Sequence, residues 1–192
     1  MPQKWNLLEV RLRQIASSLA ELRRDLQSQG INLSRPSKEL LSKEVFIEAG
    51  KVHDAYKEVR DLISGAASEV WIEDNYVDNS LFDLLSNLPP NVEVKVLTKK
   101  WPRDFPLELK KFREQYGVKM EVRTSVNFHD RFIWVDDRCY HLGASIKDAG
   151  KKAFMLSQLE DPNNVQAVRG NLENAWQSGT LIEPFADRPV AP

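Results

Sequence analysis

Two hydrophobic periodicities divide the chain. Between residues 4 and 29, apolar side chains recur at intervals of three and four positions, which keeps them on one narrow stripe of an α-helix. Gly30 then provides a helix stop. The pattern favours a short coiled coil that joins two chains or docks another protein; a helix packed on its own domain is the alternative. The stripe consists of Trp5, Leu8, Leu12, Ile15, Leu19, Leu22 and Leu26.

A second helical pattern follows a short linker at residues 31–37. Apolar positions at helical spacing run from about residue 37 to residue 64, and Gly65 ends them. We therefore assign residues 1–33 to an N-terminal helical extension and residues 34–192 to a globular domain. The stripe of this second helix consists of Val45, Ala49, Val52, Tyr56, Val59 and Ile63.

Beyond Gly65, the pattern changes to strands that alternate with helices. Short runs with a period of two predict strands, and stretches with helical spacing lie between them. This order predicts an α/β domain built on a mixed sheet with helices on its faces. We expect strands at 70–72, 92–98, 118–123, 128–135, 138–142 and 153–159, and helices at 80–88, 106–116 and 163–178.

Composition narrows the class of protein. The chain has 192 residues, enough for one domain and an appendage, and Cys139 is its one cysteine, which excludes an internal disulfide and suits a reducing cytoplasm. No stretch resembles a signal peptide, a membrane span or a zinc site, so we expect a cytoplasmic protein. The net charge is −1, but residues 95–152 carry 14 basic and 8 acidic side chains. This basic half is typical of proteins that bind phosphates, although a solvated surface is the alternative.

One segment concentrates the candidate chemistry. His129 and Arg131 are two positions apart on a predicted strand, so their side chains are expected to share a face, with Asp136 at the turn that follows. A guanidinium binds phosphate oxygens, and an imidazole can attack phosphorus or move a proton. A carboxylate on the other ring nitrogen would orient the imidazole. Gly143 lies in a turn of small residues that allows donors to approach closely.

This segment resembles the phospholipase D superfamily motif, H-x-K-x-x-x-x-D-x-x-x-x-x-x-G-S-x-N. His129, Asp136 and Gly143 match its histidine, aspartate and glycine. Residues 45–156 also resemble a bacterial branch of phospholipase D-like domains found in phage-related and mobile-element proteins, in which a helix like VHDAYKEVRDLISGA precedes a strand like VWIEDNYVD. The resemblance implies a phospholipase D-like sheet and a nucleophilic His129, with Arg131 on phosphate and Asp136 orienting the histidine. Asp74, at the end of a predicted strand, is a further candidate.

The segment departs from this motif at three positions. Arg131 replaces the lysine, and Ala144 and Ile146 replace the serine and the asparagine. Because each lost donor weakens transition-state stabilisation, two functions remain open. One is a metal-independent phosphodiesterase, in particular a nuclease. The other is a degenerate module that binds nucleic acid, a nucleotide or an anionic head group, or that serves in a phage-defence or mobile-element complex. The candidates to replace the lost donors are Asn127, Ser145 and Lys147.

The resemblance also implies a second copy of the chain. In the family, two motifs supply two histidines, one that attacks phosphorus and one that protonates the leaving oxygen. This chain has one motif, so a two-fold dimer would complete the site, with residues 4–29 as a plausible clamp. No metal and no cofactor are implied.

Overall fold

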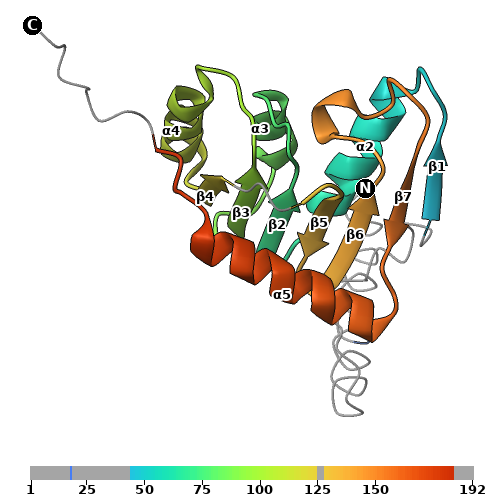
Figure 1. Ribbon diagram of the computed structural model, residues 1–192. Helices are drawn as coiled ribbons and strands as arrows, with labels where there is room; N and C mark the ends of the chain where they lie inside the picture. Colours follow the sequence, from blue (N-terminus) through green and yellow to red (C-terminus); the bar gives the residue numbers. More distant parts are fainter. Residues whose placement is uncertain (1–17, 19–43, 125–127, 184–192) are drawn as a thin grey trace, which may run out of the picture. The chain divides into compact units, whose positions relative to one another are not determined.

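The computed structural model describes residues 44–124 and 128–183, together with Ser18. Apart from Ser18, the predicted helix at residues 4–29 therefore lies outside the described residues, as does Asn127. The described domain is built on one mixed seven-stranded sheet in the order β1-β7-β6-β5-β2-β3-β4 (Figure 1). The strands are β1 (Glu44–Ile47), β2 (Glu69–Glu73), β3 (Glu93–Thr98), β4 (Lys119–Thr124), β5 (Arg131–Val135), β6 (Arg138–Leu142) and β7 (Phe154–Gln158).

The directions of the strands determine which strand ends lie side by side. β2, β3 and β4 are parallel, whereas β5 pairs antiparallel with both β2 and β6, and β7 pairs antiparallel with β6 and β1. The carboxyl ends of β2, β3, β4 and β6 therefore share one edge of the sheet with the amino ends of β5 and β7. This row of strand ends is called the site edge below, and it carries most of the candidate residues. The α/β fold and the mixed sheet predicted from the sequence are confirmed.

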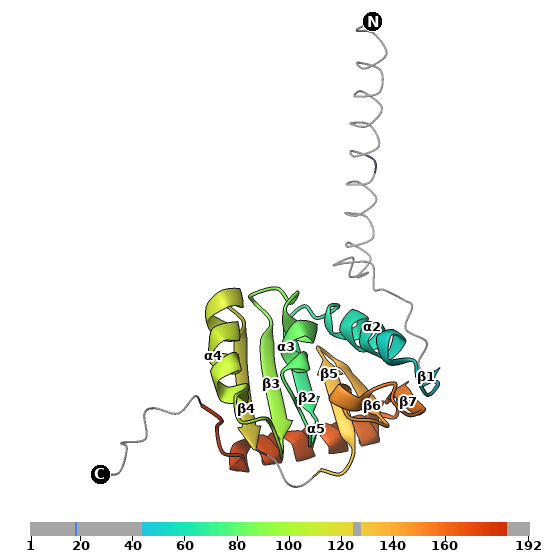
Figure 2. The same ribbon diagram turned by 90° about the horizontal axis from the view of Figure 1, so that it is seen from above.

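Helices cover both faces of the sheet. α2, α3 and α4 lie on one face, and α5 crosses the other face alone (Figure 2). Asp161 caps α5, because its carboxylate accepts a hydrogen bond of 2.9 Å from the backbone nitrogen of Asn164. No helix of the described part is long and apolar enough to cross a membrane. The helices are α2 (Val52–Ile63), α3 (Ser80–Leu85), α4 (Phe105–Tyr116) and α5 (Pro162–Ser178), with a short 3₁₀ turn η1 (Ile146–Asp148) near the site edge.

The predicted second helix at residues 37–64 is wrong over residues 44–51, and residues 37–43 lie outside the described residues. Residues Glu44–Ile47 form the edge strand β1, which pairs with β7, and the helix begins only at Val52. Gly50, with φ of 83°, makes the turn between them. The apolar residues Val45 and Ala49 fit a helical stripe by spacing, but pairing with β7 satisfies the backbone of this stretch instead. Tertiary pairing overrides local periodicity here.

The strict alternation of the strands produces two hydrophobic clusters. On β2, Val70 and Ile72 pack into the larger cluster, on the face covered by α2, α3 and α4. Trp71 points to the opposite face and packs with Leu172 and Trp176 of α5 in the smaller cluster. Consecutive residues of β2 therefore face different chemical environments. By the same alternation, the side chains of Glu73 and Asp74, at the site edge, are directed to opposite faces of the sheet.

One glycine fixes the loop that follows β6. Gly150 has φ of 79°, and a Cβ atom there would lie 2.5 Å from the carbonyl oxygen of Lys51. Its own carbonyl oxygen accepts a hydrogen bond of 2.8 Å from the backbone nitrogen of Gly50. This close approach ties the 143–150 loop, which forms one wall of the site edge, to the start of α2.

Candidate functional site

Asp74 is the centre of the site edge. Its side chain is fully buried, and its carboxylate accepts hydrogen bonds from Ser145 Oγ at 2.9 Å and from the backbone nitrogens of Ile146 at 2.7 Å and Tyr76 at 3.0 Å. Burial raises the pKa of Asp74 above its ordinary value, although these hydrogen bonds and the charge of Arg131 oppose the shift. The carboxylate therefore joins the end of β2 to the loop after β6.

Arg131 is the first residue of β5, and its charge acts directly on Asp74. Its Nε atom is buried without a hydrogen-bond partner in the described structure. A buried guanidinium nitrogen without a partner is costly unless an anion or water satisfies it. Arg131 thus lies beside a structural carboxylate, with guanidinium donor capacity that the described protein does not fully use.

His129 lies in the bend before β5, and its side chain is 98% exposed. Its Nδ1 atom is 3.4 Å from Oδ1 of Asp130, whose other oxygen is 4.0 Å from Nε2 of His141. The strand starts at Arg131, so the expected strand alternation does not extend to His129. The sequence analysis missed Asp130, whose position between two imidazoles follows from the pairing of β5 with β6.

Asp136 lies at the opposite edge of the sheet from His129. Its carboxylate accepts hydrogen bonds of 2.7–3.1 Å from the backbone nitrogens of Ala67, Ser68 and Glu69 and from the Ser68 hydroxyl. These hydrogen bonds hold the pKa of Asp136 below its ordinary value, against the opposing effect of partial burial. The extended strand β5 separates it from His129 by roughly 20 Å. The expectation that Asp136 orients the imidazole is therefore corrected: it caps the loop that leads into β2.

The remaining candidates lie in the loop after β6. Gly143 donates a hydrogen bond of 2.9 Å to the carbonyl oxygen of Met155, and a Cβ there would lie 3.4 Å from the Met155 backbone. The Ser145 hydroxyl is held between Asp74 and the Tyr76 carbonyl oxygen, so it faces protein and not open solvent. Lys147 forms an ion pair with Asp148, which raises its pKa. The structure thus brings Asp74, Arg131, Ser145 and Lys147 together.

Three solved structures share this architecture at low sequence identity. NucT from Helicobacter pylori has a TM-score of 0.55 and 11% identity, over 72% of this chain and 98% of that chain. Nuc from Salmonella typhimurium, a phospholipase D family member, has a TM-score of 0.51 and 16% identity, over 73% of this chain and 99% of that chain. The chain has a phospholipase D-like fold. TrmBL2, an archaeal chromatin protein with a novel mode of DNA binding, has a TM-score of 0.53 and 12% identity, over 94% of this chain and 68% of that chain. No family model and no curated protein sequence matches the chain.

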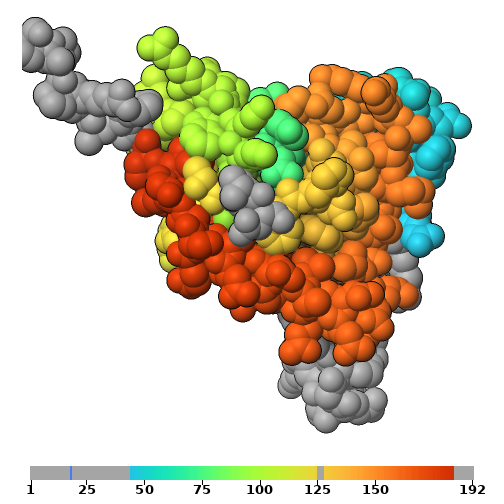
Figure 3. All heavy atoms as spheres, in the orientation of Figure 1, coloured from blue at the N-terminus to red at the C-terminus, as the bar shows by residue number. Residues whose placement is uncertain are grey.

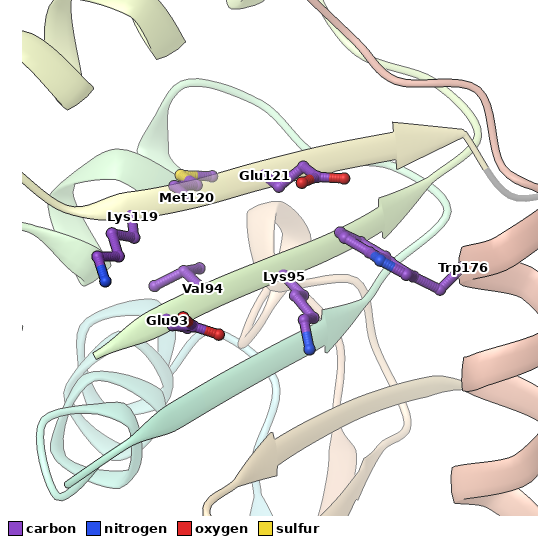
Figure 4. A pocket seen from close by; sticks show the side chains of 7 residues that line it. All are labelled: Glu93, Val94, Lys95, Lys119, Met120, Glu121 and Trp176. Carbon is purple, nitrogen blue, oxygen red and sulfur yellow. The ribbon is translucent and has the colours of Figure 1, made fainter. Parts of the chain in front are cut away.

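Within the described part of this phospholipase D-like domain, no group of three or more His, Cys, Asp or Glu side chains is arranged to hold a metal ion. On the α5 face, a hollow of about 260 Å³ over β3 and β4 is lined by Lys95, Lys119, Glu93 and Glu121 beside Trp176 (Figure 4). Its charges are mixed, and Lys95 Nζ is 3.0 Å from Glu69 Oε1. The basic half of the sequence therefore does not gather into one cationic surface there, and the candidate phosphate-binding residues remain those at the site edge.

Glu73 is a buried carboxyl group that is not among the candidates from the sequence. It is 1% exposed, and neither of its oxygens has a hydrogen-bond partner in the described structure. Burial raises its pKa to about 8, with a smaller contribution from the charge of Asp74. The unfolded chain ionises Glu73 near its ordinary value, so the folded state binds this proton more tightly between pH 4.5 and pH 8. The stability that Glu73 contributes is complete below about pH 4.5 and is lost as the pH rises towards 8.

Glutamine at this position should therefore stabilise the phospholipase D-like domain at alkaline pH. Glu73→Gln keeps the shape of the neutral carboxyl group and cannot ionise, so we expect its free energy of unfolding at pH 8 to exceed that of the wild type by about 4 kcal/mol. The difference should vanish near pH 4. Urea denaturation across this range measures it. Glu93→Gln, an exposed carboxylate on the neighbouring strand, is the control and should change stability by less than about 0.5 kcal/mol. A constant difference at all pH values would contradict the assignment.

Proposed function

We propose that the chain is a metal-independent phosphodiesterase that cleaves nucleic acid as a homodimer. The observation that carries this proposal is the placement, at the site edge of a phospholipase D-like fold, of an exposed imidazole two residues before a guanidinium whose buried Nε has no hydrogen-bond partner in the described structure. His129 is open to a ligand, and Arg131 lies close enough to Asp74 for its charge to act on that carboxylate. The local excess of basic residues between positions 95 and 152 supports a polyanionic substrate.

The proposed reaction has two steps. Nε2 of His129 attacks phosphorus, a P–N bond forms, and the P–O bond to the leaving group breaks. His129 of a second copy, acting as an acid, gives its proton to the leaving oxygen. Water then attacks the phosphohistidine, passes its proton to that second histidine, and releases the phosphate monoester and the free imidazole. Arg131 binds the equatorial oxygens throughout, because a guanidinium offers two parallel donors to a phosphate.

Only one histidine of this motif is present in each chain, so the proposal requires a dimer. The almost complete exposure of His129 fits a side chain that a second copy covers in the assembled site. A two-fold axis close to His129 would place the two imidazoles on opposite sides of one phosphorus atom. Residues 4–29 are the proposed clamp for this assembly.

The test uses the full-length protein with single-stranded and double-stranded DNA and RNA in excess EDTA. We expect slow but complete conversion to fragments, and light scattering should give twice the mass of one chain. Cleavage that stops in EDTA and returns with a divalent cation would overturn metal independence. A stable monomer with full activity would overturn the shared site.

A binding module without catalysis is the second candidate, and one observation favours it. The hydroxyl of Ser145 is turned to Asp74, and positions 144 and 146 carry Ala144 and Ile146, so the loop offers few side-chain donors to a transition state. The likeness of the fold to TrmBL2 agrees with nucleic-acid binding. If the protein binds nucleic acid with a steep dependence on salt and never cuts it, this second candidate replaces the first.

A further inference from the structure

A cavity of about 480 Å³ lies between the start of β5 and helix α5. The chain around Phe128–Phe132 forms one wall, and one face of α5 forms the other. Figure 3 shows these two segments against each other on one side of the molecule, the first in yellow and the helix in red. The volume falls in the range of small-molecule sites in proteins. His129 is part of the rim, so the cavity and the proposed phosphate site share one residue.

Two aromatic rings lie in the wall on the β5 side. Phe128 and Phe132 are partly buried, and their ring centroids are 6.3 Å apart at an interplanar angle of 76°. Both rings pack against the smaller hydrophobic cluster, and this packing fixes their position. A planar heterocycle that enters the cavity can stack on one ring and contact the edge of the other. Such stacking is worth about 1–3 kcal/mol per base and is tolerant of base identity.

The wall formed by α5 supplies hydrogen-bonding groups. Asn171, Asn174 and Ser178 recur at intervals of three and four, which places them along one face of the helix. No hydrogen bond to the side-chain amide of Asn174 is found in the described part of the chain, and this amide offers both donors and an acceptor. Asp130 adds a carboxylate that can accept from an exocyclic amino group. The amide nitrogen of Asn171 donates to the carbonyl oxygen of Ala167, so Asn174 is the unpaired amide of this wall. Aromatic rings beside an unpaired amide are the chemistry that recognises a base edge.

The described lining of the cavity is poor in cations, which favours a base over a phosphate as the group that fills it. No lysine or arginine is among its described lining residues, whereas Arg131 and Lys147 lie at the site edge, close enough to Asp74 for their charges to act on it. Phe132 and Arg131 are consecutive on β5, so their side chains point to opposite faces of the sheet. Arg131 and the aromatic rings thus lie on opposite faces of β5, and His129, in the bend before the strand, lines the cavity.

We propose that this cavity is the subsite for a nucleobase of the strand whose phosphate is held at His129. The inference rests on the proposed function and adds to it the part of the substrate that gives affinity. A base bound in the cavity draws its attached phosphate to the imidazole, because the two sites share His129. The subsite accepts single-stranded or locally unpaired nucleic acid, since a base can enter the cavity only when it is unstacked.

The test compares two ligands of equal length and charge, an oligothymidylate and an abasic deoxyribose-phosphate oligomer, both with phosphorothioate linkages that slow cleavage. Fluorescence anisotropy gives the affinity of the full-length protein for each. We expect the wild type to bind the oligothymidylate about tenfold more tightly than the abasic oligomer. Phe128→Ala removes a stacking ring, and Asn174→Trp fills the cavity from an exposed helix position. Both variants should lose the preference for the base-containing ligand and keep the wild-type affinity for the abasic one.

Gln177→Trp is the matched control, because Gln177 is an exposed residue of α5 that does not line the cavity. It should retain the tenfold preference. Equal binding of oligothymidylate by Asn174→Trp and Gln177→Trp would overturn the subsite. So would equal affinity of the wild type for the two ligands, an outcome that leaves the phosphate site untouched. Failure of the wild type to bind either ligand would overturn the proposed function and the subsite with it.

Discussion

Replacing His129 with alanine should lower the rate of phosphodiester cleavage by about 10³-fold or more while leaving the fold intact. The side chain is 98% exposed, so its loss removes little packing, and the melting temperature should stay within about 1 °C of the wild-type value. The rate falls because the variant lacks the imidazole that is proposed to attack phosphorus. Removal of a covalent nucleophile typically costs several orders of magnitude in kcat. The measurement is fragment release from labelled nucleic acid in EDTA.

Two matched variants separate this effect from nonspecific loss of a histidine. His53 is exposed on α2, and His53→Ala should cleave at the wild-type rate. Arg131→Lys restores the residue type of the phospholipase D motif and keeps a cation at the site, so it should retain or raise activity. If His129→Ala cleaves as fast as His53→Ala, the imidazole is not the nucleophile and the binding-module candidate gains.

Replacing Asp136 with alanine should destabilise the domain strongly without acting on catalysis directly. The carboxylate holds three backbone nitrogens and one hydroxyl of the loop before β2, and alanine leaves all four without this partner. Asp136 also has φ of 54°, a left-handed conformation that alanine tolerates less well than aspartate or asparagine. We expect a loss of about 3 kcal/mol in the free energy of unfolding, equivalent to a fall in melting temperature of about 10 °C.

The control for this prediction is the neighbouring residue. Asp137 is in the same turn with its side chain 91% exposed, and Asp137→Ala should change stability by less than about 0.5 kcal/mol. The pH dependence follows from the lowered pKa of Asp136. Its contribution is complete above pH 4 and is lost as the pH falls through its folded value, so wild type and variant should converge in acid. If Asp136→Ala unfolds like the wild type but cleaves 10³-fold more slowly, the capping assignment is wrong.

Asp136 also shows where the sequence stops being sufficient. Its spacing from His129 matches the phospholipase D motif, and the motif correctly predicts the fold. A spacing of seven residues can place two side chains together only if the chain turns between them. Here the intervening residues form the extended strand β5, paired on both sides, so the two side chains lie at opposite edges of the sheet.

The strands were predictable because their alternation has a direct physical cause. Val70 and Ile72 must be buried on one face and Trp71 on the other, and the sequence carries this pattern without help from distant residues. β1 was not predictable, because Glu44–Ile47 becomes a strand only through pairing with β7, more than a hundred residues later. Arg131 and Asp74 lie 57 positions apart, and their proximity depends on the order of strands that no local pattern encodes.

The packing beneath α5 gives the protein a built-in optical reporter. Trp71 and Trp176 meet edge to face at 5.4 Å, and the guanidinium of Arg169 lies 4.8 Å from the ring centre of Trp71 and 5.1 Å from that of Trp134. Three of the five tryptophans of the chain thus share one shielded environment next to the proposed base subsite. Lys95 and Arg123 also lie over the rings of Trp71 and Trp176, at 4.9 Å and 4.8 Å. The ultraviolet emission of these tryptophans depends on the fields of such nearby cations and on exclusion of water by the helix. A ligand that shifts α5 on the sheet will therefore change the wavelength and the intensity of the intrinsic tryptophan fluorescence, so its binding can be followed without an added label.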